Sequence, residues 1–174
     1  MFGWCGRVLV VDLTTGSLIT ESLSEDVLRD YLGGRGLGIY YLLREVDPTC
    51  DPLSPENALI MSVGPLTGTS APTGARYMVT TKSPLTGAIT CANSGGLFPA
   101  SLKKAGWDAV VIKGRSTDPV YLWIDGEKAE LRPAHHLMGL TTHETEDKIR
   151  SETHPKPRWR VLGLQVKTWC ALRP

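Results

Sequence analysis

Local metal-binding motifs are missing from this 174-residue sequence. Its four cysteines, Cys5, Cys50, Cys91 and Cys170, lie far apart, and no Cys-x-x-Cys pair occurs. Zinc knuckles and iron–sulfur motifs place cysteines within a few residues of one another, so we expect these cysteines to be buried free thiols. A P-loop, a nucleophile elbow and a His-Glu-x-x-His helix are also missing, which argues against chemistry that depends on those motifs.

The sequence also lacks an excess of charge and a long apolar run. Lys and Arg number 19 and Asp and Glu number 18, so the formal net charge is +1. Without a strong field of one sign, a nucleic acid partner is not expected. No apolar run approaches the roughly 20 residues of a membrane-spanning helix, and residues 1–4 lack the basic segment that opens a secretory signal. These features predict a cytoplasmic protein with no membrane partner.

Apolar runs joined by turn residues predict antiparallel strands in one domain. The turn Thr14-Thr15-Gly16-Ser17 joins runs at residues 8–13 and 18–23, and Asp125-Gly126 joins runs at residues 120–124 and 129–131. Each pair is expected to form a hairpin. Further strands are expected at residues 58–63, 77–81, 88–92 and 108–113, and helices at residues 25–32, 37–46, 96–105 and 142–152. The predicted class is α+β, with mostly antiparallel, hairpin-rich sheets and a few helices.

Two glycine-rich patterns need separate interpretation. Residues 33–38, GGRGLG, have the spacing of a dinucleotide fingerprint, but that motif follows a strand, and here a predicted helix precedes it. We therefore expect a turn between two helices. Residues 64–68, GPLTG, and residues 83–87, SPLTG, repeat a turn that follows a predicted strand. This repeat suggests two similar loops on one side of the sheet.

Two further segments have the composition of a ligand site. Residues 64–76, GPLTGTSAPTGAR, combine glycines, hydroxyl groups and the guanidinium of Arg76, which suits a phosphate or carboxylate. Residues 91–96, CANSGG, lead into a predicted helix, and Asn93 has an oxygen suited to a hard cation. On chemistry alone, a structural loop and a helix-capping asparagine are equally good interpretations.

The same segments carry a family resemblance. RVLVVDLTTG, GGRGLG, DPLSPEN, GPLTGTSAPTGARY, TKSPLTG, ANSGG, LKKAGWDAVVIKG and PVYLWI follow one another in an order that resembles the N-terminal domain of aldehyde:ferredoxin oxidoreductases. The resemblance runs from Gly3 to about Arg158. It implies an enzyme that oxidises aldehydes to carboxylic acids at a tungsten- or molybdenum-bis-pterin cofactor and passes electrons through a [4Fe-4S] cluster to ferredoxin.

The resemblance also implies roles for four residues. Arg76 would lie between pterin and cluster, and the backbone carbonyl of Asn93 would bind the magnesium that joins the pterin phosphates. Ser94 and Gly95 would contact the pterin through the backbone. No residue of this chain is assigned to catalysis, because the family's cluster cysteines and acid–base residues lie in later domains. Pro99 departs from the family pattern, which has Gly there.

The family pattern ends near residue 158. Residues 159–174, WRVLGLQVKTWCALRP, do not match it, but a reading shifted by one base permits PAGEDLVRFA, the expected continuation. We therefore expect an incomplete cofactor-platform domain at residues 1–158 and an out-of-frame tail at residues 159–174, in a chain that is inactive by itself. A stand-alone pterin- or phosphate-binding module, or a protein-interaction module, is the alternative. The choice of tungsten or molybdenum, the aldehyde and a homodimer are left open.

Overall fold

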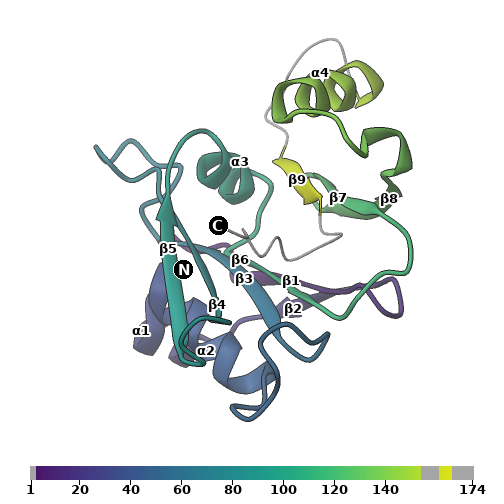
Figure 1. Cartoon of the computed structure of the whole chain (residues 1–174). Coiled ribbons are helices and arrows are strands. Elements are labelled where there is room, and N and C mark those ends of the chain that lie inside the picture. Colours follow the sequence, from purple (N-terminus) through teal and green to yellow (C-terminus); the bar gives the residue numbers. More distant parts are fainter. Residues whose placement is uncertain (1–2, 154–160, 166–174) are drawn as a thin grey trace.

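The computed structural model describes residues 3–153 and the backbone of residues 161–165 (Figure 1). Its strands are β1 (Arg7–Asp12), β2 (Ser17–Ser22), β3 (Ala58–Val63), β4 (Tyr77–Lys82), β5 (Ile89–Ser94), β6 (Ala109–Lys113), β7 (Val120–Asp125), β8 (Lys128–Pro133) and β9 (Val161–Gln165). Its helices are α1 (Glu25–Tyr31), α2 (Gly34–Glu45), α3 (Phe98–Lys104), the 3-10 turn η1 (His135–Leu137) and α4 (Thr142–Thr153). The α+β prediction is confirmed. Among the described residues, no helix is long and apolar enough to cross a membrane.

The main sheet has six strands in the order β2-β1-β6-β3-β4-β5. Strands β1 and β6 run parallel, and the other neighbouring pairs of this sheet are antiparallel. The parallel pair joins segments about 100 residues apart, since Val8 lies opposite Ala109. Strand β5 is an edge of the sheet, with β4 as its neighbour.

Both faces of the main sheet are covered (Figure 1). Helices α1 and α2 pack on one face, where Val8 and Val111 join Leu28 of α1 and Tyr41 of α2 in one buried cluster. Helix α3 and strand β7 pack on the other face in a second cluster with the neighbouring strand residues. Successive side chains of β1 and β6 thus enter different cores, which explains why these strands read as nearly continuous apolar runs.

Glycines allow α2 to begin early and to lie directly on the sheet. The helix begins at Gly34 rather than at the predicted residue 37, after Gly33, whose φ of 141° suits glycine. A Cβ atom on Gly38 would collide with the side chain of Thr80 in β4. The segment GGRGLG therefore connects α1 to α2 and packs α2 on β4, and the prediction of a helix-to-helix turn is confirmed.

Most local caps and turns follow the sequence pattern. The Ser24 hydroxyl accepts a hydrogen bond from the Val27 amide at the start of α1, at 3.3 Å. Thr141 and Glu144 form the expected capping box, in which the Glu144 carboxylate accepts from the Thr141 amide at 2.7 Å. Pro99 lies in the first turn of α3, where it replaces no helical donor. Its departure from the family pattern is therefore compatible with the helix.

The prediction that the two PLTG loops lie on one side of the sheet is wrong. Residues 64–68 follow the end of β3, and residues 83–87 follow the end of β4. Strands β3 and β4 are antiparallel, with Val63 opposite Tyr77 and Ile60 opposite Thr80. Two loops that follow antiparallel neighbours lie at opposite ends of the sheet.

A second sheet has the order β8-β7-β9. The hairpin of β7 and β8 turns at Asp125-Gly126 as predicted, with Asp125 opposite Lys128. Strand β9 pairs antiparallel with β7 and lies inside the segment 159–174 that the sequence assigns to an out-of-frame tail. An apolar segment of any origin can pair with an open strand edge. The boundary at residue 158 therefore stays a prediction.

Candidate functional site

The predicted site residues meet where β5 ends at the edge of the main sheet. Arg76 is the last residue before β4, and Asn93 and Ser94 are the last two residues of β5. The antiparallel register places Tyr77 opposite Ser94. Residues 17 positions apart in the sequence are thereby adjacent, and Gly95 follows directly.

A hydrogen bond joins the two side chains on which the prediction rests. The Arg76 guanidinium donates through Nη1 to Oδ1 of Asn93 at 3.0 Å, and Nδ2 of Asn93 donates to the sulfur of Met78 at 3.3 Å. These contacts define which way the Asn93 amide points. The expectation that Arg76 and Asn93 share one face is confirmed. Both side chains are exposed, so the guanidinium can still donate to a ligand.

The strand β5 is longer than the sequence suggested. Asn93 and Ser94 were expected in a loop before a helix, but both belong to the strand, and α3 begins only at Phe98. The interpretation of Asn93 as a helix-capping residue is therefore wrong. The strand extends because β4 begins at Tyr77 and supplies a partner for each residue as far as Ser94.

The residues at this corner leave room for a backbone-bound ligand. Gly95 has no positive φ, and a Cβ built on it would lie 3.5 Å from the Ala75 carbonyl oxygen and 3.6 Å from Cδ of Arg76, which are ordinary contact distances. Contacts with the described residues thus do not require glycine here. The space beside Gly95 and the exposed guanidinium of Arg76 are compatible with the cofactor that the resemblance implies.

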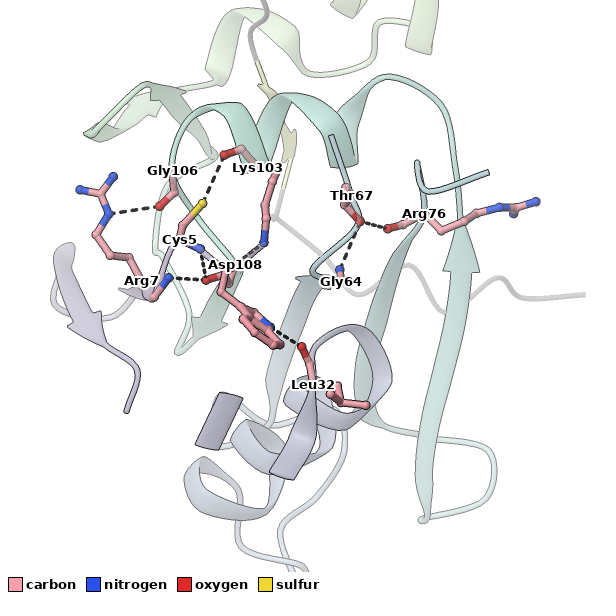
Figure 2. Close-up of polar contacts among 11 residues, drawn as sticks. Cys5, Arg7, Leu32, Gly64, Thr67, Arg76, Lys103, Gly106 and Asp108 are labelled. Carbon is pink, nitrogen blue, oxygen red and sulfur yellow. Dashed lines mark hydrogen bonds and ion pairs between the residues drawn. The ribbon is translucent and has the colours of Figure 1, made fainter. Parts of the chain in front are cut away.

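The loop of residues 64–76 brings Arg76 to this corner. A Cβ on Gly74 would approach the Leu66 carbonyl oxygen to 2.8 Å, so the two sides of the loop touch. Thr67 is 3% exposed, and its hydroxyl contacts both ends of the loop. It accepts from the Gly64 amide at 3.2 Å and donates to the Arg76 carbonyl at 3.4 Å (Figure 2). The hydroxyl of Thr67 thus joins the two ends of the loop, and Arg76 lies at one of these joined ends.

A buried carboxylate next to this loop was not foreseen from the sequence. Asp108 is fully buried, accepts from the amides of Cys5 and Gly6 at 2.9 and 2.6 Å, and forms an ion pair with Lys103 (Figure 2). Lys103 packs in turn against Gly68 of the loop, where a Cβ would lie 3.4 Å from Cβ of Lys103. The apparent signal, an aspartate directly before a buried strand, is too common to identify such a network.

The cysteines are free thiols in the described part of the chain, but only Cys50 is buried. Cys5 and Cys91 are partly exposed, so the expectation of burial is wrong for these two. Burial and the nearby Asp108 carboxylate raise the pKa of Cys5, which keeps this thiol protonated and poorly nucleophilic. Cys170 lies outside the described residues.

A separate hollow of about 570 Å³ lies at the opposite end of the main sheet. Its lining includes Asp12, Glu45, Asp47 and Lys113. Burial raises the pKa of Glu45, but hydrogen bonds from Lys113 and Arg44 outweigh this effect and hold the pKa below 4.5. The described residues contain no group of three His, Cys, Asp or Glu side chains placed to hold a metal ion. Glu45 and Lys113 thus form an ion pair at 2.8 Å, and the carboxylates of Asp12 and Asp47 accept hydrogen bonds from the amides of Thr14 and Thr49.

Comparison with known proteins identifies the family. A family model described as "Aldehyde ferredoxin oxidoreductase, N-terminal domain" matches residues 8–166. The chain belongs to this family. The match covers both sheets and the candidate corner.

Two curated relatives are named "Tungsten-containing aldehyde ferredoxin oxidoreductase". The protein from Pyrococcus furiosus is 57% identical over 152 residues, which are 87% of this chain and 25% of the relative. The protein from Pyrococcus abyssi is 54% identical over 156 residues, which are 90% of this chain and 26% of the relative. The chain therefore spans about a quarter of the length of these relatives.

A solved structure with the same fold belongs to a protein with a different activity. It is described as "Active site complex BamBC of Benzoyl Coenzyme A reductase in complex with 1,5 Dienoyl-CoA" and superimposes with a TM-score of 0.84 at 39% sequence identity. The superposition covers 87% of this chain and 23% of that chain. The N-terminal architecture is thus shared by proteins with different substrates, and it does not by itself select one.

Proposed function

We propose that this chain is the cofactor-platform part of a tungsten-containing aldehyde ferredoxin oxidoreductase. The observation that carries the proposal is the hydrogen bond between Arg76 and Asn93 at an exposed corner of the sheet. Gly95 lies next to this bond, and a larger residue could occupy its position without a clash with the described residues. The names of the curated relatives favour tungsten over molybdenum and aldehydes over other substrates. Ferredoxin is the electron acceptor in this proposal.

On this proposal each site residue binds or orients the cofactor. The Arg76 guanidinium has five N–H donors in a planar array, and Asn93 accepts one of them, which leaves donors for an acceptor on the pterin. The backbone of Ser94 and Gly95 would contact the pterin, and the backbone carbonyl of Asn93 would bind the magnesium. The same guanidinium would place a positive charge beside the [4Fe-4S] cluster.

The bound group supplies the redox chemistry, in which an aldehyde and a water molecule give a carboxylic acid, two protons and two electrons. This chain's part is to fix the cofactor against a rigid sheet and to supply a positive charge near it. We therefore expect the isolated chain to be inactive. No acid–base pair in it is assigned to the reaction.

The test uses a hybrid enzyme, in which residues 3–158 of this chain replace the matching segment of the Pyrococcus furiosus relative. The hybrid is expected to contain tungsten and pterin and to reduce ferredoxin with an aldehyde. A hybrid that folds but contains no tungsten would refute the platform proposal.

Within the hybrid, Arg76→Ala should lower turnover about tenfold to a hundredfold, because a hydrogen bond from a charged group contributes about 1.5–3 kcal/mol. Its melting temperature should stay within about 2 °C, since an exposed side chain adds little to stability. Arg115→Ala is the matched control, because Arg115 is also exposed but follows β6 at the far end of the sheet. Equal turnover in Arg76→Ala and the control would remove Arg76 from the site.

The stand-alone binding module makes the opposite prediction. A carrier holds its ligand on its own chain, so the purified 174-residue chain would bind the pterin cofactor or inorganic phosphate in equilibrium dialysis. Our proposal expects that the chain alone retains neither the pterin cofactor nor phosphate. The corner at Arg76 and Asn93 is one exposed side of a site, and on the family resemblance later segments would complete it.

A further inference from the structure

A buried hydroxyl connects the two ends of the loop that carries Arg76. Thr67 lies three residues after Gly64 and nine residues before Arg76, and its hydroxyl bonds to the main chain of both. A hydroxyl can donate one hydrogen bond and accept others, so this one group satisfies a backbone donor and a backbone acceptor together. The loop closes on Thr67 (Figure 2).

The floor of the loop is held independently of Thr67. A Cβ on Gly68 would lie 3.6 Å from the Ala100 carbonyl oxygen of α3, so the loop lies directly on this helix. At the far end of the loop, Tyr77 packs on Phe98 with ring centroids 4.7 Å apart. Because α3 supports both sides, packing opposes a movement of the loop as a whole. The bond from Thr67 adds a direct tie to the Arg76 carbonyl within this packed loop.

We propose that Thr67 is a positioning residue for Arg76. Its hydroxyl fixes the Arg76 carbonyl from within the fold, while Asn93 fixes the guanidinium from the neighbouring strand. Arg76 is thus held at its main chain and at its tip before a ligand arrives, and less freedom is lost when the cofactor binds. This inference rests on the proposed function of Arg76.

The sequence offers an internal control for this role. Thr86 occupies the same position in SPLTG as Thr67 does in GPLTG. Among the residues that the structure describes, its hydroxyl accepts a local bond from the Ala88 amide at 3.3 Å, and its side chain is exposed at the other end of the sheet. A Thr→Val substitution removes the same hydroxyl from the same motif at both positions, but only at position 67 does it remove a bond to Arg76.

The experiment compares Thr67→Val, Thr67→Ser and Thr86→Val in the hybrid enzyme, alone and together with Arg76→Ala. Readouts are tungsten and pterin content, turnover, melting temperature and the electron paramagnetic resonance spectrum of the tungsten(V) state. Thr67→Val should lower turnover about fivefold to tenfold, as expected when one neutral hydrogen bond that contributes about 1 kcal/mol is lost. It should shift the spectrum in the same direction as Arg76→Ala does. Thr67→Ser should restore both readouts, and Thr86→Val should change neither.

The double variant separates positioning from general stability. If Thr67 acts through Arg76, adding Thr67→Val to Arg76→Ala lowers turnover no further. Independent, multiplicative losses, or a lower melting temperature with an unshifted spectrum, would overturn the inference. If the Thr67→Val protein cannot be produced in folded form, a comparison of Thr67→Ala with Thr67→Ser tests the same hydroxyl. Equal turnover in these two variants would also overturn the inference. An Arg76→Ala variant with full activity would instead remove Arg76 from the site, and a folded hybrid without tungsten would refute the proposed function itself.

Discussion

Asp108 should be one of the most sensitive positions for the stability of this domain. Its carboxylate has no exposure to solvent, accepts two backbone hydrogen bonds from Cys5 and Gly6, and pairs with Lys103, whose side chain is 10% exposed. Asp108→Asn keeps the shape but removes the negative charge. The ammonium group of Lys103 then stays nearly buried without its counter-charge.

The expected loss of stability follows from this geometry. Breaking a buried ion pair by removing one partner costs about 3–5 kcal/mol. Lys103 can reach solvent by rotation of its long side chain, and the Asn side chain keeps one acceptor oxygen for the amides. We therefore expect the lower limit, about 3 kcal/mol, which corresponds to a fall of about 6–12 °C in melting temperature for a chain of this size.

The assay is unfolding of the chain in urea, monitored by tryptophan fluorescence. Trp107 is 1% exposed and precedes Asp108 directly, so it reports unfolding of this region. Glu127→Gln is the control, because Glu127 pairs with Arg7 while its side chain is 78% exposed. Exposed pairs contribute about 0–1 kcal/mol, and this variant should be nearly neutral.

A double-mutant cycle tests the cause of the loss. Lys103→Met removes the ammonium group. In that background, Asp108→Asn should lower the free energy of unfolding by at least about 1 kcal/mol less than it does alone, because residues in contact typically show a coupling energy of about this size. A cost below about 1 kcal/mol for Asp108→Asn, or strict additivity with Lys103→Met, would refute the reasoning, whichever way the control behaves.

Two further predictions concern acid stability and the end of the chain. The folded-state pKa of Glu45 lies below its ordinary value of 4.5, so its contribution is present above that pH and is lost as the pH falls through the folded-state pKa. Glu45→Gln should therefore flatten the fall in the free energy of unfolding below pH 4.5, and a profile identical to the wild type would contradict this. Removal of residues 159–174 should leave melting unchanged or improved, and sequencing of the gene should reveal an in-frame PAGED after a one-base change before the codon of Val161. A cooperative loss of stability on truncation, or an intact frame, would show that the segment with β9 belongs to the native domain.

Short-range features of this fold could be predicted because their causes lie within a few residues. The Ser24 cap, the Thr141–Glu144 capping box and the Asp125-Gly126 turn each depend on contacts inside one turn of chain. Strand ends were less accurate. Strand β5 continues to Ser94 only because β4 offers a matching partner, and no pattern within residues 88–94 encodes the length of another strand.

The candidate site shows the same division. The sequence, through its motifs, determined the family and singled out Arg76, Asn93, Ser94 and Gly95. The tertiary structure decided that Arg76 and Asn93 touch, because strand pairing brings together residues 17 positions apart. It also gave the two PLTG segments different environments, since Thr67 is buried within the loop that lies on α3 and Thr86 is exposed at the opposite end of the sheet. A residue's own side chain and its near neighbours set which bonds it is able to make. Which partners it meets depends on chain segments that are distant in sequence and packed beside it, as Asp108 meets Cys5 across 103 positions.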